Sequence, residues 1–223
     1  MKQRRLLVLV VSTVAVGLTM AVHAQSDVPQ TPAMPGMQPG EVLAAVNGDI
    51  LTKADLEAKQ IAEIRRRGQP ASGEHMAKAL AEVTPDALVA AVDEMLLLHR
   101  GKELGMRVTE QQVQHVLEAL RKENKLESDE AFASALQKER LDLPALRQTL
   151  ERQLVVNQVM NHEVVLSVTP QEVGKTAYDE KRRAESDIYI RRLRSKAIIE
   201  WKNEDMRKLW IAKTSAPPTD QKA

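Results

Sequence analysis

Residues 42–55 read Val-Leu-Ala-Ala-Val-Asn-Gly-Asp-Ile-Leu-Thr-Lys-Ala-Asp, and this stretch decides the fold. The apolar run Val42–Val46 is followed by Asn47-Gly48, a dipeptide typical of tight turns between strands. Thr52 can then cap a helix, because Asp55 stands three residues later and can bind the amide of the cap. The stretch therefore predicts a short strand, a tight turn and the start of a helix.

A lone strand needs a partner to satisfy its backbone groups. The segment Ala197-Ile198-Ile199-Glu200-Trp201 is rich in β-branched and aromatic residues, which favour strands. Because Val42–Val46 is the comparable run in the sequence, we expect these two segments to pair in a small sheet.

Everything between these strands favours helices. Aromatic residues make up 2% of the chain, and Ala, Leu, Glu, Lys, Arg and Gln are abundant. Residues suited to helix N-termini recur along the chain, at Thr84-Pro85, Thr109, Ser128, Asp142 and Thr169-Pro170. We expect the helix that starts at Thr84 to end near Gly105, and the helix that starts at Thr169 to reach Arg194. The predicted fold is mainly α, with a small sheet formed by the N-terminal and C-terminal strands.

The N-terminus has the layout of a secretory signal peptide. Lys2, Arg4 and Arg5 precede an apolar stretch that ends at Met20, and Val22-His23-Ala24 supplies small residues for cleavage. We predict a signal peptide over residues 1–24, cut between Ala24 and Gln25, and a periplasmic protein with no stable membrane insertion after the cut. The alternative is an uncleaved anchor that tethers the protein to the inner membrane. Residues 25–41, which are rich in proline and glycine, predict a flexible linker.

The charge distribution gives no reason to propose nucleic acid as a partner. Residues 25–180 carry seventeen cations and twenty-five anions, whereas residues 181–213 carry eleven cations and five anions. The basic segment either docks on the acidic body of its own fold or forms a patch for another protein.

The sequence predicts no catalytic, cofactor or metal site. The chain has no cysteine, and among His75, His99, His115 and His162 no two are spaced like a helical metal pair. His99, beside an apolar helix face, is interpreted as a core or boundary residue. No glycine-rich phosphate loop and no nucleophile elbow is present.

The order of these segments resembles the SurA-type chaperone family. The segments that carry the resemblance are Val46 to Thr52 with Asp55-Leu56, Met95 to Leu98, Gly105 to Val113, Leu141 to Leu150, Gln153 to Val156, Val168 to Val173, and Ile190 to Arg194 with Ala197 to Glu200. The resemblance implies a SurA N-terminal-like chaperone domain over residues 42–202, with a closing helix and strand at 184–202. Residues 203–223 are then expected to be a tail that is disordered at its end.

Family members with isomerase activity carry a parvulin domain between the helix that starts near Thr169 and the closing helix. Here that interval holds only residues 178–183, and a domain of roughly one hundred residues cannot fit. The sequence therefore predicts that the chain is not an enzyme.

The resemblance implies an ATP-independent holdase that binds unfolded outer-membrane or secreted proteins in an apolar helical cradle. The client-contact candidates are Met95, Leu98, Met106, Phe132, Val156 and Met160, although methionine at helical spacing is also common in cores. A dedicated assembly factor for one envelope partner is the alternative, and an isomerase-related enzyme comes third. A homodimer with exchanged helices is a further option that the sequence leaves open.

Overall fold

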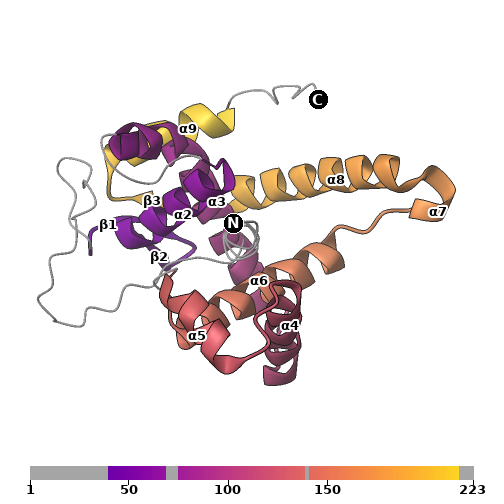
Figure 1. The fold of residues 1–223 in the computed structure, drawn as a ribbon. Helices are drawn as coiled ribbons and strands as arrows, with labels where there is room; N and C mark the ends of the chain where they lie inside the picture. The colour runs from indigo at the N-terminus through magenta and orange to yellow at the C-terminus, as the bar shows by residue number, and fades with distance from the viewer. Residues whose placement is uncertain (1–39, 69–74, 139–140, 216–223) are drawn as a thin grey trace, which may run out of the picture.

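A computed structural model of the chain describes residues 40–68, 75–138 and 141–215 (Figure 1). The predicted signal peptide and nearly all of the predicted linker lie outside these residues. The elements, in chain order, are β1 (Val42–Val46), β2 (Asp49–Thr52), α2 (Lys53–Arg66), α3 (His75–Glu103), α4 (Glu110–Glu123), α5 (Asp129–Lys138), α6 (Leu143–Glu163), α7 (Pro170–Val173), α8 (Lys175–Lys196), β3 (Ile199–Trp201) and α9 (Glu204–Ser215).

The sheet joins the two ends of the described chain, as the sequence predicted. Its strand order is β2-β1-β3, and both pairs are antiparallel. Asn47 and Gly48 have φ angles of 48° and 88°, the left-handed conformations that a two-residue hairpin turn requires. Asn47 also ties the turn to the C-terminal segment: its amide donates to the Ile198 carbonyl, and its side-chain oxygen accepts from the Ile198 amide, both at 2.9 Å. The sheet also contains a third strand, β2, which the sequence analysis did not predict.

Buried apolar side chains gather in separate clusters, most of which include residues of the long helix α3. One cluster joins the sheet, α3 and α9, and includes Leu43, Leu88, Val92 and Met206. A second lies among α4, α5 and α6, and a third joins α3, α6 and α8. Figure 1 shows the α4–α6 group below the sheet, while α8 extends away as an arm with α7 at its far end. The mainly α fold with a small terminal sheet is therefore confirmed.

The predicted start of the central helix is wrong. Thr84 and Pro85 lie inside α3, which begins at His75. The first turns are held by burial, because Leu80 and Val83 pack against Ile64 of α2. The Thr84 hydroxyl donates to the Leu80 carbonyl and accepts from the Gln60 side chain, each at 2.6 Å. Tertiary packing thus offsets the one backbone hydrogen bond that the proline removes.

The helix expected from Thr169 to Arg194 is two helices. Gly174, with φ of 81°, ends α7 after a single turn, and α8 begins at the next residue and continues to Lys196. The described chain from α6 to β3 is continuous, so no domain is inserted between α7 and the closing strand.

The expected C-terminal tail is also partly wrong. Residues Glu204–Ser215 form α9, which begins where the Asn203 side chain accepts a bond from the Met206 amide at 3.1 Å. Met206 is 1% exposed and belongs to the same cluster as the sheet, so the domain extends past residue 202 to Ser215. The last eight residues lie outside the described part of the chain.

Part of the basic C-terminal segment docks on the body of its own fold. The Arg194 guanidinium binds both oxygens of Asp93 on α3, at 2.7 and 2.6 Å. Lys213 of α9 lies 2.7 Å from Asp86 of α3. Within residues 40–68, 75–138 and 141–215, no helix has the length and apolar character needed to cross a bilayer.

Candidate functional site

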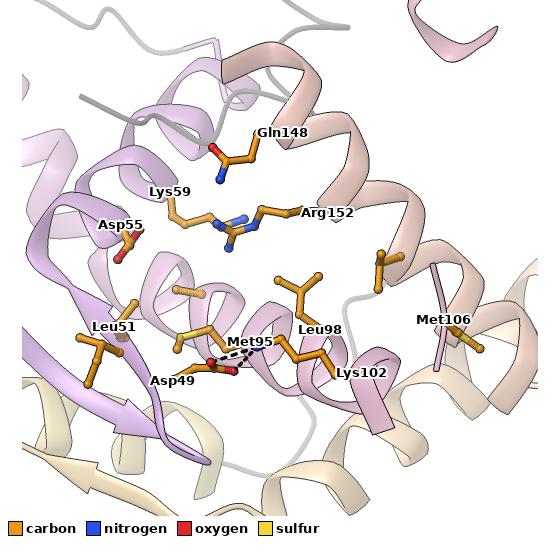
Figure 2. A pocket seen from close by; sticks show the side chains of 13 residues that line it. Asp49, Leu51, Asp55, Lys59, Met95, Leu98, Lys102, Met106, Gln148 and Arg152 are labelled. Atoms are coloured by element: carbon orange, nitrogen blue, oxygen red, sulfur yellow. Dashed lines mark hydrogen bonds and ion pairs between the residues drawn. The ribbon is translucent and has the colours of Figure 1, made fainter. Parts of the chain in front are cut away.

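A groove opens between α2 and α6, with the middle of α3 as its floor and β2 at one edge (Figure 2). Its cavity measures about 480 Å³. The lining side chains are Asp49, Ile50, Leu51, Asp55, Lys59, Ala91, Met95, Leu98, Lys102, Met106, Gln148, Arg152 and Val155.

The floor of the groove is apolar because of the spacing of residues on α3. Ala91, Met95 and Leu98 follow one another at intervals of four and three, so they share one face of the helix. Val155 of α6 extends this surface. A cavity lined by such residues is a recognised type of binding site.

The end of α3 places one further apolar side chain in the groove. Gly105, with φ of 67°, ends the helix, and its amide donates to the Lys102 carbonyl at 3.0 Å. The Met106 amide donates to the Gly101 carbonyl at 2.9 Å. This pair of bonds is the Schellman arrangement, and it turns Met106 toward the groove beside α6.

Charged side chains bridge the groove at its centre. Glu94 of α3 binds Lys59 of α2 and Arg152 of α6, the latter through Nε and Nη2 at 2.9 and 2.7 Å. The three side chains are 18, 16 and 33% exposed, in the order Lys59, Glu94, Arg152. Figure 2 shows Lys59 and Arg152 reaching toward each other from opposite walls. This ionic bridge ties the two walls to the floor.

A second hollow of about 310 Å³ adjoins the groove at the ionic bridge, since Lys59 and Arg152 line both cavities and Glu94 lines the second. Its apolar lining includes Leu97 and Val156. Asp93 lies at its edge, where burial raises the pKa of the carboxyl and the bonds from Arg194 oppose this rise.

The outer rim of the groove is charged as well. Lys102 lies 3.0 Å from the Asp49 carboxylate, and Figure 2 marks this ion pair. His99 lies between Asp49 and Glu103, at 3.9 and 3.5 Å, at the boundary where the sequence placed it. Among the described residues, no three potential ligands gather as a metal site would require.

The structure separates the six client-contact candidates. Met95, Leu98 and Met106 line the groove together, and Val156 lines the adjoining hollow. Met160 is partly buried against the cluster that joins α3, α6 and α8. Phe132 is 6% exposed inside the α4–α6 cluster, where the Arg121 guanidinium covers its ring at 5.0 Å.

Sequence reasoning missed the polar residues of the groove. Lys59, Glu94 and Arg152 come from three helices, and each has the ordinary appearance of a charged residue on an amphipathic helix. Only the packing of α2 and α6 on α3 brings them together, and no local pattern in the sequence marks that packing.

Comparison with known proteins places this fold in a family. The family model of the SurA-like N-terminal domain matches residues 2–160. Chaperone SurA of Chromohalobacter salexigens is 26% identical over 153 residues, covering 66% of this chain and 34% of that protein. Chaperone SurA of Salmonella paratyphi A is 22% identical over 167 residues, covering 74% of this chain and 36% of that protein. The chain spans about a third of the length of these curated relatives. It belongs to the SurA-like N-terminal domain family, and the relatives that it matches are named chaperones.

Proposed function

We propose that this protein is an ATP-independent holdase chaperone that binds unfolded polypeptides in the groove between α2 and α6. The observation that carries the proposal is the apolar floor formed by Met95, Leu98, Val155 and Met106 in an open cavity of about 480 Å³. Leu98 and Met106 are partly exposed there. Methionine side chains such as Met106 adapt to many partner shapes, which suits a protein with varied clients.

The family supports the same function, because the relatives that the chain matches are named chaperones. The match covers about a third of each of these relatives, so their full activity need not reside in the matched part. The groove uses only residues 49–155, and the family match covers this span.

The proposed location is the periplasm, with unfolded outer-membrane or secreted proteins as clients. Residues 1–24 support it, since they combine a basic start, an apolar stretch and small residues before Gln25. N-terminal sequencing of the protein from bacterial envelopes tests the location. A mature chain that starts at Gln25 supports export with cleavage, and an intact N-terminus in the membrane fraction supports the anchored alternative.

The function is tested by aggregation of unfolded clients, followed by light scattering at an equimolar amount of chaperone. We expect suppression for several unrelated clients without ATP. The double variant Leu98→Gln, Met106→Gln should weaken client binding about tenfold, because it removes apolar surface from the groove. The matched control is Ile188→Gln on α8, which is 43% exposed and lies outside the groove. It should suppress aggregation as well as the unaltered protein.

Other outcomes discriminate between functions. Suppression for a single client, together with co-purification of that one protein, supports a dedicated assembly factor. No suppression for any client contradicts the holdase. An equal loss in the Ile188→Gln control contradicts the assignment to the groove.

A further inference from the structure

The ionic bridge carries more positive than negative charge. Two cations, Lys59 and Arg152, share the single carboxylate of Glu94. Arg152 uses Nε and Nη2 for this contact, and its Nη1 has no protein partner in the described part of the chain. A guanidinium carries five N–H donors, so a second acceptor can bind on the free edge.

The other carboxylates near the bridge are already engaged. Asp55 accepts from the Thr52 amide and hydroxyl at 2.9 and 2.6 Å, at the N-terminus of α2. Asp49 pairs with Lys102, and Asp93 pairs with Arg194. Asp55 keeps its negative charge, because both of its donors are neutral, so the open feature of the ionic bridge is the free N–H edge of Arg152 and not a net positive charge of the groove. Because the side chains of Lys59, Glu94 and Arg152 are at most one third exposed, water screens an ion pair with Arg152 less there than on an open surface.

Apolar surface lies on both sides of the ionic bridge. Met95, Leu98 and Val155 lie on the groove side of the ionic bridge, and Leu97 and Val156 lie on the side of the second hollow. An extended polypeptide points alternate side chains the same way, at roughly 3.3 Å per residue. A client that crosses the bridge can thus present one side chain to Arg152 and its second neighbours to the two hollows.

We propose that the groove selects extended client segments in which one Asp or Glu has apolar residues two positions before and two positions after it. The client carboxylate accepts hydrogen bonds from the free edge of Arg152 and from Lys59. This inference rests on the proposed holdase function and adds to it a charge preference in the client.

A pair of labelled peptides of about 12 residues tests the preference by fluorescence anisotropy with the purified protein. Both carry Leu two positions before and after a central residue, which is Glu in one peptide and Gln in the other. Both are blocked at their C-termini. At low ionic strength we expect the Glu peptide to bind about fivefold more tightly, as a partly exposed ion pair allows. In 1 M salt, where the screening length is about 3 Å, the two affinities should converge.

Variants assign the preference to the ionic bridge. Arg152→Gln should abolish it, because it removes the guanidinium that binds the client carboxylate, and Arg152→Lys should keep most of it, because a cationic donor remains. Lys59→Gln removes the other cation of the ionic bridge, which lies on α2, and it should also weaken the preference. If one of the two variants fails to fold, the other still tests the inference. The matched control is Arg147→Gln on α6, whose partner Glu110 lies outside the groove. It should leave the fivefold ratio unchanged.

Equal binding of the two peptides overturns this inference and leaves the holdase function intact. A preference that survives both Arg152→Gln and Lys59→Gln also overturns it. If tight binding is seen only with peptides whose C-terminal carboxylate is left unblocked, the protein recognises a chain end, and the inference is overturned. Failure of both peptides to bind, together with no suppression of aggregation, overturns the holdase function itself.

Discussion

Gly101 of α3 faces Val155 and Val159 of α6, and its replacement by alanine tests how closely the two helices pack. A Cβ atom at Gly101 would lie 2.6 Å from Cγ1 of Val155 and 3.3 Å from Cγ2 of Val159. Carbon atoms pack best at about 3.5–4.0 Å, so the first contact is a severe overlap. Valine in a helix strongly prefers one χ1 rotamer, which prevents Val155 from turning away at low cost.

Two opposing effects, helix propensity and overpacking, set the change in the free energy of unfolding. Alanine in the interior of a helix is favoured over glycine by about 1 kcal/mol. Overpacking between well-packed elements costs about 1–3 kcal/mol. We therefore expect Gly101→Ala to lower the free energy of unfolding by about 1 kcal/mol. In a Val155→Ala background the severe overlap is removed and only the milder contact with Val159 remains, so the same substitution should raise the free energy of unfolding by up to about 1 kcal/mol.

Equilibrium unfolding in urea, followed by far-UV circular dichroism, measures all four members of this double-mutant cycle. The expected coupling energy is up to about 2 kcal/mol, with alanine at 101 changing sign between backgrounds. Ala90→Gly is the matched control for helix propensity, since Ala90 is exposed on the same helix, and it should cost about 1 kcal/mol. If Gly101→Ala stabilises the unaltered protein as much as it stabilises the Val155→Ala variant, the close contact of α3 and α6 is refuted.

Three more predictions concern the ties between the C-terminal elements and α3. Arg194→Met should cost about 2–3 kcal/mol at neutral pH, because it leaves the partly buried Asp93 carboxylate without its partner. Since burial raises the pKa of Asp93, the folded state binds a proton more readily than the unfolded state. Part of the lost stability should therefore return as the pH falls through that raised pKa, and urea unfolding at several pH values checks the sign. Trp201→Ala should cost about 2–3 kcal/mol, because the ring packs on Trp210 at a centroid distance of 5.8 Å; a loss below about 0.5 kcal/mol in thermal unfolding contradicts this contact. Met206→Ala should cost about 3 kcal/mol in urea unfolding, whereas Ile211→Ala, on the exposed side of the same helix, should cost under about 0.5 kcal/mol. Equal effects of these last two variants would show that α9 does not dock through Met206.

Local chemistry in the sequence was enough to predict the ends of several helices. Thr52 with Asp55, and Thr109 with Gln112, form reciprocal capping boxes, and the Asp142 side chain caps α6. The Asn47-Gly48 turn and the pairing of β1 with β3 were predictable for the same reason, since turn and strand preferences are properties of short segments.

The errors arose where distant packing decides the structure. Pro85 is a strong start signal in isolation, but Leu80 and Val83 gain a buried surface on α2 only when the helix begins earlier. Residues after 202 carry many charges and resemble a tail, yet Met206 and Trp210 fit the cluster beneath the sheet. The ionic bridge could not be predicted from the sequence for the same reason, because its three residues meet only after α2 and α6 have packed on α3.

The contact between Asn47 and Ile198 joins residues that lie 151 positions apart in the chain. A ribosome that adds about 5–20 residues per second makes Ile198 roughly 8 to 30 s after Asn47. Through that interval the central strand of the sheet lacks one neighbour, and Met206 has not yet been synthesised to close the cluster beneath it. The native sheet can therefore form only after Trp201 has been made. Until then, one edge of the apolar strand β1 is unpaired and open to other strands.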